Sequence, residues 1–573
     1  MCNNPVKNSY EYWLNSSEVD NGTKDELKKI KSNKQEIKLR FISYLEFGTA
    51  GLRGEMKAGT YMMNIYTVRH ATQGFAEYIL KENKSDRGVV IAYDSRNNSK
   101  EFAREAACVM AANNIPVYLF GEIKPTPMLS YAVRELKCIA GINITASHNP
   151  KEYNGYKAYW EDGAQLAPDQ AYEVSVFIKS TDIFKGVKTM DYNEAESSGL
   201  IKIIDKDFDE KYISEVISQA VNPDVIKETA DDLKIVYTPL HGTGRVIIPE
   251  VLERIGVKYL YTVPEQMIAD GNFPTVKFPN PEYKEVFDLG IQIAKKIDSD
   301  LIIATDPDAD RTGIMVRGND GNFITFTGNQ VGALLLDYII AALKSKNIMP
   351  AEPYAVKTIV TTELVTKICE ENNVKLHNVL TGFKFIGEII KQHEASGHGD
   401  FIFGFEESYG YLKGTYARDK DAVVTSMLLC EMAAFYKKQG MTLYDALTAM
   451  YKKYGYYTES TDSLDYKKFD GIQKMKNIMA HIRNNPPVTL GGEKIVSLSD
   501  YQKGTMTDLC TGKVDPTGLP PSDVLYYKTE KGNVTVIRPS GTEPKIKIYY
   551  LLHAPASVDS FKSDSYIQKI RAF

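Results

Sequence analysis

The chain has 573 residues, of which 43% are hydrophobic and 25% charged, and a formal net charge of −5. One hydrophobic core does not reach this size, so we expect roughly three to five domains. The negative charge gives no basic field for nucleic acid, no apolar run reaches the ~18 residues of a membrane span, and the N-terminus does not resemble a signal peptide. Six scattered cysteines without Cys-x-x-Cys spacing argue against a disulfide framework and a thiolate zinc site. These features favour a cytoplasmic protein with small-molecule partners, not nucleic acid or membrane.

The first part of the chain alternates strand and helix patterns. Charged residues 10–45 have a helical pattern. After them we expect a strand at Val89–Tyr93, a helix from Ser99 to about Ala112 with Ser99 as N-cap, a strand at Pro116–Phe120, a short helix after a Pro-rich turn, and a strand ending at Thr145. This order predicts a mostly parallel sheet with helices on both faces.

The same order recurs twice. The second round comprises strand Leu233–Tyr237, helix Gly244–Ile255, strand Val257–Val263, helix Glu282–Lys296 and strand Leu301–Thr305. The third comprises helix Gly328–Lys344, a strand around Val356–Thr361, a helix from Glu363 and strand Phe401–Phe405. These segments predict two further α/β domains.

The pattern of alternating strands and helices ends at about Gly455. A helix near Gly471–Arg483 and a hairpin-like pair of strands, Val534–Ile537 and Lys545–Leu551, indicate a smaller α+β domain. We therefore expect three similar mixed α/β domains and one α+β C-terminal domain around a central cleft. The expected domains are residues 1–205, 206–322, 323–455 and 456–573.

The loop Thr145–Pro150 follows a buried-looking strand. Carboxyl ends of parallel strands are where α/β sheets place ligand sites, and the amides of a following helix can face an anion. Ser147 is a weak nucleophile alone and needs activation or a preloaded phosphate. An ordinary turn is the alternative interpretation, because Asn-Pro and Ser-x-x-Pro are common in turns.

The loop Asp306–Arg311 also follows an apolar strand. Its three carboxylates, Asp306, Asp308 and Asp310, would repel one another unless a cation such as Mg²⁺ or Ca²⁺ lay between them. An EF-hand is excluded because Arg311 and Arg317 stand where the loop glycine and the bidentate glutamate should be, and because a strand precedes the loop. A solvated acidic turn remains the alternative.

The loop Gly404–Gly410 carries adjacent carboxylates and a serine between two glycines. These groups could exchange hydrogen bonds with vicinal sugar hydroxyls. On its own the pattern is weak and is more typical of a surface turn than of a binding site.

The loop Arg538–Lys545 lies between two strands. Arg538 is the planar, always-charged type of phosphate ligand, and Ser540, Gly541 and Thr542 could complete an anion nest. A simple hairpin connection is the alternative. Taken together, the four loops contain the parts of a phosphoryl-transfer site.

In order along nearly the whole chain, these loops resemble those of the α-D-phosphohexomutase superfamily, which includes phosphoglucomutases and phosphomannomutases. The similar segments are Thr145–Pro150 (phosphoserine loop), Asp306–Arg311 (metal loop), Gly404–Ser408 (sugar loop) and Arg538–Thr542 (phosphate loop), with support from 48–54, 154–157, 238–244 and 381–384. The Phe-Glu-Glu-Ser-Tyr-Gly sugar loop and the chain length are most similar to the longer bacterial phosphoglucomutases, a branch that includes phosphopentomutase-like members. Because Tyr409-Gly410 replaces the commoner Gly-His, the preferred sugar stays open.

The resemblance implies a phosphoglucomutase, an isomerase that interconverts glucose 1-phosphate and glucose 6-phosphate. PhosphoSer147, with Mg²⁺ on Ser147, Asp306, Asp308 and Asp310, would give its phosphate to the sugar phosphate. Ser147 would then take back the other phosphate from a glucose 1,6-bisphosphate intermediate, which also serves as activator. Phosphomannomutase and phosphopentomutase are alternatives with the same mechanism.

The resemblance also implies roles for other residues. His148, Lys157 and Lys384 are candidates for proton transfer, or for phosphate neutralisation without it, and Arg53 supports the phosphoserine or the sugar. The residues implied in substrate binding are Arg311, Glu406, Ser408, Arg538, Ser540, Gly541 and Thr542. A sugar phosphatase and a non-catalytic sugar-phosphate binder are the rival functions, while no nucleotide loop supports a kinase.

Overall fold

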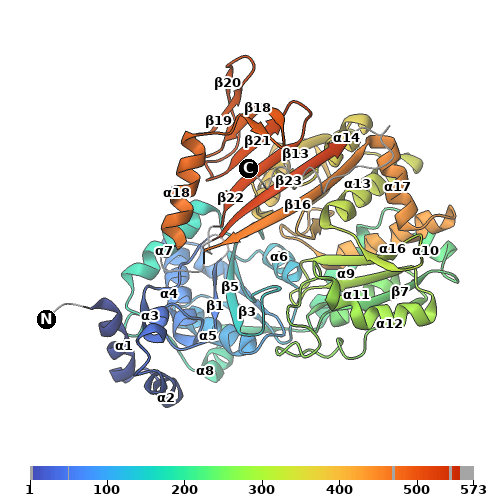
Figure 1. The fold of residues 1–573 in the computed structure, drawn as a ribbon. Helices are drawn as coiled ribbons and strands as arrows, with labels where there is room; N and C mark the ends of the chain where they lie inside the picture. Colours follow the sequence, from blue (N-terminus) through green and yellow to red (C-terminus); the bar gives the residue numbers. More distant parts are fainter. Residues whose placement is uncertain (1–3, 49–50, 467–470, 541–544, 555–573) are drawn as a thin grey trace. The chain divides into compact units, whose positions relative to one another are not determined.

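A computed structural model describes residues 4–48, 51–466, 471–540 and 545–554. The chain forms two compact units, drawn in Figure 1. The first unit contains Met1–Phe326 and Gly410–Gln439, and the second contains Thr327–Tyr409 and Gly440–Phe573. The chain therefore enters the second unit, returns to the first for one segment, and ends in the second.

Three helices begin the first unit: α1 (Pro5–Asn15), α2 (Asn21–Lys29) and α3 (Lys34–Phe41). Each follows an Asn or Asp whose side chain accepts a hydrogen bond from an amide of the first turn. Trp13 is fully buried and meets Phe41 and Tyr66 edge-on. The helical pattern expected for residues 10–45 is confirmed.

The first sheet has the strand order β1-β5-β4-β2-β3-β6. The strands are β1 (Leu52–Glu55), β2 (Val89–Tyr93), β3 (Val117–Phe120), β4 (Ala140–Ile144), β5 (Tyr153–Trp160) and β6 (Ile201–Ile204). The four strands β4, β2, β3 and β6 are parallel, and β1 and β5 are antiparallel at one edge. The expected mostly parallel sheet is thus confirmed.

Helices cover both faces of this sheet. They are α4 (Ile65–Lys81), α5 (Ser99–Ala112), α6 (Thr126–Glu135) and α7 (Pro168–Ser180), and α8 (Tyr192–Ser197) packs on α5. Val89 and Ile91 belong to the core formed with α4 and α5, whereas Val90 points to the opposite face and is also fully buried. The expected N-cap of α5 is wrong by one residue: Asn98 is the cap, and Ser99 Oγ instead donates to Asp94 Oδ1 at 2.7 Å.

The second sheet has the order β11-β10-β9-β7-β8. Its strands are β7 (Lys234–Thr238), β8 (Tyr259–Thr262), β9 (Leu301–Thr305), β10 (Thr312–Arg317) and β11 (Phe323–Thr325), of which β7, β8 and β9 are parallel. Around it lie α9 (Asp207–Ser218), α10 (Asp224–Glu228), α11 (Gly244–Arg254), α12 (Asp288–Ile297) and α16 (Ala422–Lys438). The helix expected at Glu282–Lys296 starts later, because Lys284–Phe287 forms a separate 3-10 turn before α12.

The second unit begins with a parallel β13-β12-β14 arrangement. Its strands are β12 (Pro353–Thr358), β13 (Lys375–Val379) and β14 (Asp400–Glu406), and its helices are α13 (Gly328–Ser345), α14 (Leu364–Asn372), α15 (Phe383–Ser396) and α17 (Leu443–Tyr454). The sequence did not indicate β13 and α15. The short strand β15 (Gly410–Leu412) leads back into the first unit.

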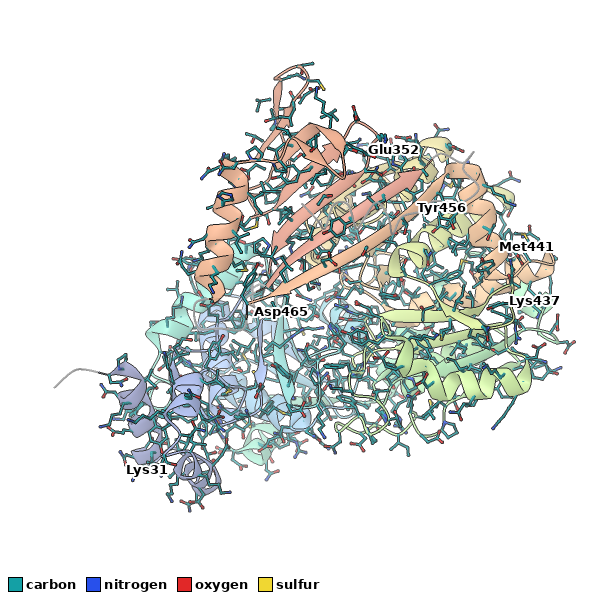
Figure 2. All side chains as sticks on the ribbon, in the orientation of Figure 1. Lys31, Glu352, Lys437, Met441, Tyr456 and Asp465 are labelled. Atoms are coloured by element: carbon teal, nitrogen blue, oxygen red, sulfur yellow. The ribbon has the colours of Figure 1, made fainter. Side chains whose placement is uncertain are left out.

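The C-terminal part is an antiparallel sheet with the order β16-β23-β22-β21-β18-β19-β20. The strands are β16 (Tyr456–Asp465), β18 (Glu493–Asp500), β19 (Thr505–Asp508), β20 (Val514–Pro516), β21 (Leu525–Thr529), β22 (Val534–Pro539) and β23 (Lys545–Ala554), and β17 (Thr489–Leu490) pairs with β18. Tyr456 and Asp465, labelled in Figure 2, end the long strand that pairs with β23. Helix α18 (Gly471–Asn484) packs on β23, so the expected α+β domain is confirmed.

Among the residues that the structure describes, no helix combines the length and apolar composition needed to cross a membrane. Four cysteines there are buried as free thiols, namely Cys108, Cys138, Cys369 and Cys430, and Cys510 is free and exposed.

Candidate active site

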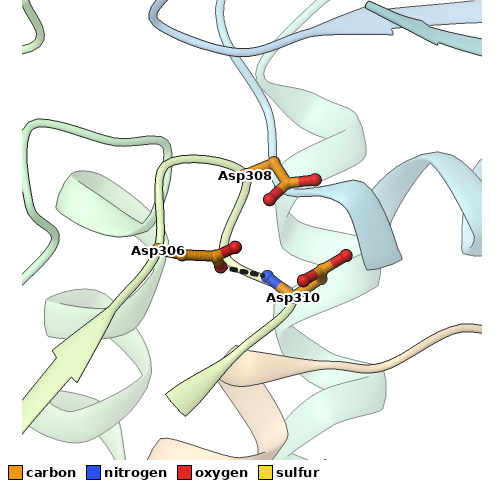
Figure 3. Close-up of side chains that lie close together, drawn as sticks. All are labelled: Asp306, Asp308 and Asp310. Atoms are coloured by element: carbon orange, nitrogen blue, oxygen red, sulfur yellow. Dashed lines mark hydrogen bonds between the residues drawn. The ribbon is translucent and has the colours of Figure 1, made fainter. Parts of the chain in front are cut away.

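The acidic loop between β9 and β10 brings three carboxylates together. One oxygen from each of Asp306, Asp308 and Asp310 lies within 4.8 Å of the others, and all three residues are buried. Figure 3 shows them projecting from one loop, in which Asp306 Oδ1 accepts a hydrogen bond from the Asp310 amide at 3.1 Å. Ala309 adopts a positive φ of 50°, which closes the turn. The strand-loop-strand order therefore gathers negative charge in a buried place.

This carboxylate cluster suits a divalent cation. Asp308 Oδ1 and Asp310 Oδ1 are buried and accept no hydrogen bond from the described residues. Burial, followed by the charges of Asp308 and Asp310, raises the pKa of Asp306 well above its ordinary value. A hard cation with oxygen ligands, such as Mg²⁺, would satisfy the unpaired oxygens and offset the repulsion. The residues present fit such an ion.

Ser147 faces this cluster. Its Oγ donates to Asp306 Oδ2 at 2.7 Å and lies 3.2 Å from Nδ1 of His148. The residue follows β4 and has a positive φ of 52°, a conformation that non-glycine residues rarely adopt. Such strain persists only where the surroundings fix it, and it is typical of functional loops.

Lys157 on β5 balances the negative charge. Its Nζ lies 2.7 Å from Asp308 and 3.1 Å from Asp310, with the lysine 5% exposed. Burial alone would lower the pKa of Lys157, but the two carboxylates outweigh it and raise that pKa. Lys157 is therefore held in the charged form.

Lys420 is a second buried cation at the cluster, which the sequence reasoning missed. Its Nζ lies 3.2 Å from Asp310 and 3.0 Å from Asp419. Burial would raise the pKa of Asp310, but Lys157 and Lys420 together lower it far below its ordinary value. The signal was a run of charged residues, Arg418–Asp421, placed directly before the apolar helix α16.

Thr126 is another contact that the sequence did not indicate. Its Oγ1 donates to Asp308 Oδ2 at 2.7 Å and accepts from Asn143 Nδ2 at 2.7 Å. Thr126 begins α6, so this hydrogen bond joins the first α/β domain to the acidic loop of the second.

The other expected residues of this unit lie around the same loops. Arg53 Nη1 donates to Asn149 Oδ1 at 3.0 Å, and Arg311 Nη1 donates to Glu282 at 3.0 Å. Burial, then the charges of Arg311 and Arg53, lowers the pKa of His148 well below its ordinary value. The His148 ring is therefore neutral, with Nδ1 beside the serine hydroxyl.

The sugar loop lies in the second unit, at the end of β14. Glu406 Oε1 accepts from the Gly382 amide at 2.8 Å, and Glu407 Oε2 accepts from Thr358 Oγ1 at 3.3 Å. Burial, then the charge of Glu406, raises the pKa of Glu407 to about 7. Ser408 follows in the turn and is half-buried.

Gly328 and Lys384 are two further residues of the second unit that lie next to this loop or to its hydrogen-bond partner. A Cβ on Gly328 at the start of α13 would come within 2.1 Å of the Glu407 carbonyl oxygen, so glycine permits the close approach. Lys384 lies in the first turn of α15, just after Gly382, and burial lowers its pKa to about 8. The expected lysine is thus next to the segment that binds Glu406.

The phosphate loop connects β22 and β23. Arg538 stands directly opposite Lys547 in the antiparallel ladder, and the Ser540 amide donates to the Lys545 carbonyl at 2.8 Å. Both cations are close enough to Glu407 to lower its pKa against the stronger effect of burial. Gly541 and Thr542 lie outside the described residues.

Comparisons with known proteins show the family to which the chain belongs. Residues 44–183, 210–320 and 327–454 match the sequence profiles described as phosphoglucomutase/phosphomannomutase alpha/beta/alpha domains I, II and III. A phosphoglucomutase of Staphylococcus saprophyticus is 38% identical over 512 residues, or 89% of this chain and 91% of its own. One from Staphylococcus epidermidis is 38% identical over 527 residues, or 92% and 93%.

A crystal structure of parafusin, a phosphoglucomutase of Paramecium, in an open form superposes with a TM-score of 0.69. The likeness covers 92% of this chain and 94% of that one at 18% identity. At this identity the similarity concerns the fold, which the two chains share over nearly their whole lengths.

Proposed function

Because this chain belongs to the phosphoglucomutase/phosphomannomutase family and is a mutase of the isomerase class, we propose that it interconverts glucose 1-phosphate and glucose 6-phosphate. The carrier of the phosphate is Ser147, and glucose 1,6-bisphosphate is the intermediate and activator. Curated relatives of similar length are phosphoglucomutases, which favours glucose as the sugar.

The observation that carries the proposal is the contact between Ser147 and the acidic loop. A serine Oγ that lies 2.7 Å from Asp306 Oδ2 can pass its phosphate into the reach of a cation bound to Asp306, Asp308 and Asp310. Mg²⁺, when bound there, would withdraw charge from the transferring phosphoryl group. Lys157 and Lys420 offset the remaining negative charge of the carboxylates.

In the first transfer, the free hydroxyl of the sugar phosphate attacks the phosphorus of phosphoSer147. A bond from the sugar oxygen to phosphorus forms as the bond to Ser147 Oγ breaks. The hydroxyl proton leaves to a base, and the departing Ser147 Oγ takes up a proton to become a hydroxyl. Lys384 is a candidate base, since a pKa of about 8 leaves part of its amine neutral near neutral pH. The bisphosphate then turns around.

In the second transfer, Ser147 Oγ attacks the other phosphate of the bisphosphate, and the bond from that phosphorus to the sugar oxygen breaks. The sugar oxygen takes back the proton that the base removed in the first transfer. The serine proton passes to His148 Nδ1, a neutral acceptor at 3.2 Å. Lys157, which stays charged, supports the developing negative charge instead of moving a proton. Arg53 and Arg311 add positive charge beside the serine and the acidic loop.

The loops of the second unit hold the sugar. Glu406 and Ser408 accept and donate hydrogen bonds to the ring hydroxyls in either orientation of the sugar. Arg538, Ser540, Gly541 and Thr542 bind the phosphate that is not being transferred, because a nearly symmetric phosphate can be held in both poses. The cleft in which the four loops would meet remains a prediction, as do the expected domain limits.

Mannose and pentose phosphates are alternative substrates of the same chemistry, because the family description names phosphomannomutase as well. A panel of glucose, mannose, ribose and deoxyribose 1-phosphates, each supplied with Mg²⁺ and its 1,6- or 1,5-bisphosphate, separates these possibilities. Glucose 1-phosphate should give the highest kcat/KM. A higher value for another sugar would reassign the substrate and leave the mechanism intact.

A sugar phosphatase is the rival reaction, because it would use the same serine and cation but admit water. Incubation with glucose 1-phosphate and Mg²⁺ should yield glucose 6-phosphate without free phosphate. Release of inorganic phosphate as the main product would reject the mutase proposal.

Soluble sugar phosphates as partners, and buried free thiols, favour a cytoplasmic location.

A further inference from the structure

Arg96 is a fully buried arginine behind the serine loop, with no role in the chemistry above. It lies between β2 and α5, and its side chain is 0% exposed. A buried guanidinium is unfavourable unless each of its N–H groups is directed at a partner. Its partners therefore indicate why it is there.

The guanidinium binds carbonyl groups of the serine loop, Thr145–Pro150, and of Tyr153, the first residue of β5. Nη1 donates to the carbonyls of Pro150 at 2.9 Å and Tyr153 at 3.1 Å. Nη2 donates to the carbonyls of Ser147 and Asn149. Four carbonyl dipoles thus point at a single planar cation, and without it they would repel one another in a buried place.

The orientation of Arg96 is itself fixed. Its Nε lies 3.3 Å from Asp94 Oδ2, and its Cζ lies 5.0 Å from the centre of the Phe273 ring. Asp94 is held in turn, because its Oδ1 accepts from the Arg96 amide at 2.9 Å and from Ser99 Oγ. The guanidinium is therefore held by Asp94 and the Phe273 ring as well as by the carbonyls of the serine loop.

One of the two carbonyls that Nη2 binds belongs to Ser147, the residue with the strained backbone. Ser147 has a positive φ of 52°, and this conformation directs its Oγ to Asp306. A strained residue keeps its conformation only if the surroundings over-determine it. Arg96 supplies this restraint through its hydrogen bond to the Ser147 carbonyl.

We propose that Arg96 is a positioning residue that fixes the backbone of the serine loop and so aims Ser147 Oγ for phosphoryl transfer; this rests on the proposed function of Ser147. A lysine cannot replace it, because an ammonium has three donors without the planar fork that reaches four carbonyls. The role proposed for Arg96 is to hold the backbone of the loop through these carbonyls, without binding the phosphoryl group itself. Its effect on phosphoryl transfer would pass through the position of Ser147 Oγ.

The first test is Arg96→Lys, assayed with glucose 1-phosphate, its 1,6-bisphosphate and Mg²⁺. We expect kcat to fall by about 100-fold, as for a small misplacement of a reacting group, while KM changes less than about threefold. Intact-mass measurement should show slower loading of Ser147 by the bisphosphate, and the thermal unfolding temperature should stay close to that of the wild type. Wild-type kcat and loading rate in this variant would overturn the proposal.

Chemical rescue supplies a readout that a general loss of stability does not move. Arg96→Ala should regain part of its kcat when millimolar guanidinium is added, but not with equal sodium chloride or urea. The matched control is Arg104→Ala, in which the lost guanidinium lies 4.8 Å from the ring centre of Tyr192 and away from the serine loop. Arg104→Ala should keep wild-type turnover and show no response to guanidinium.

The outcomes separate this inference from the proposed function. If wild-type Ser147 never carries phosphate, the proposed function fails. If the wild type turns over through phosphoSer147 but Arg96→Lys does so equally well, only the role of Arg96 fails. Loss of the folded state in both Arg96 variants would also overturn the positioning role of Arg96, because the arginine would then be required for folding.

Discussion

The candidate functional residues of the first unit and those of the second unit differ in how their charges are arranged. In the first unit opposite charges alternate: Lys157 bridges Asp308 and Asp310, and Lys420 lies between Asp310 and Asp419. In the second unit like charges stand together, with Glu406 next to Glu407 and Arg538 opposite Lys547.

This contrast indicates what each unit lacks before substrate arrives. In the first unit, Ser147 already lies beside the acidic loop, and a cation and a phosphate on Ser147 would complete the proposed site, because two carboxylate oxygens accept no hydrogen bond from the described residues. Under the proposed function, the second unit would bind the hydroxyls of the sugar through Glu406 and its phosphate through Arg538. We therefore expect changes in the first unit to affect mainly kcat and changes in the second to affect mainly KM.

The largest effect should come from Ser147→Ala. Removal of the carrier should lower kcat by at least about 10⁴-fold, which is the scale for loss of a catalytic nucleophile. Circular dichroism should show an unchanged fold, since alanine fits the space of serine. A variant that retained substantial turnover through the normal bisphosphate would contradict the role of Ser147.

Asp308→Asn should have the next largest effect. The amide keeps the shape but removes the charge that Lys157 and a bound cation require, so kcat should fall by about 100- to 1000-fold. Titration of activity with Mg²⁺ should show that more metal is needed. The matched control is Asp320→Asn in the exposed turn between β10 and β11, which should behave as wild type.

Glu406→Gln tests the second unit. The amide oxygen can still accept from the Gly382 amide, but the charge-assisted hydrogen bonds to sugar hydroxyls are lost. KM should rise by about 10- to 100-fold with a smaller change in kcat. Glu388→Gln, on the exposed face of α15, is the control. A fall in kcat at constant KM would break the contrast between the two units.

The smallest effect concerns pH. Burial lowers the pKa of Lys384 to about 8, so its ammonium is present below that pH and is lost as the pH rises through it. If the charged form helps to bind sugar phosphate, KM should rise by up to about tenfold per pH unit above pH 8. Lys384→Arg should flatten this rise, and Lys367→Arg on the exposed side of α14 should not. An identical KM profile in wild type and Lys384→Arg would assign Lys384 to proton transfer only.

The sequence was most informative where an apolar strand runs directly into a polar loop. The strand Leu301–Thr305 was predicted with its observed limits, because five apolar or β-forming residues precede the acidic loop. Strand β13 was missed, because Lys375, His377 and Asn378 give it a polar appearance although parallel pairing with β12 stabilises it. Tertiary pairing thus overrode the local pattern.

The sequence likewise predicted only part of the candidate site. Ser147 and the three aspartates are marked by position after strands, but Lys420 and Thr126 reach the cluster only through tertiary packing. The run Arg418–Asp421 has the composition of a solvated turn, yet all four residues are buried by the fold. Arg96 likewise gave no signal, because its partners are backbone carbonyls that no side-chain motif records.

The central claim, that Ser147 is a reusable phosphate carrier, can be tested by following its phosphate through one turnover. The enzyme is loaded at Ser147 from glucose 1,6-bisphosphate carrying radioactive phosphate, freed of excess ligand, and mixed with unlabelled glucose 1-phosphate and Mg²⁺. We expect the label to leave Ser147 and appear in the bisphosphate and in glucose 6-phosphate. Label that stayed on the protein during turnover, or that appeared as inorganic phosphate, would contradict the claim.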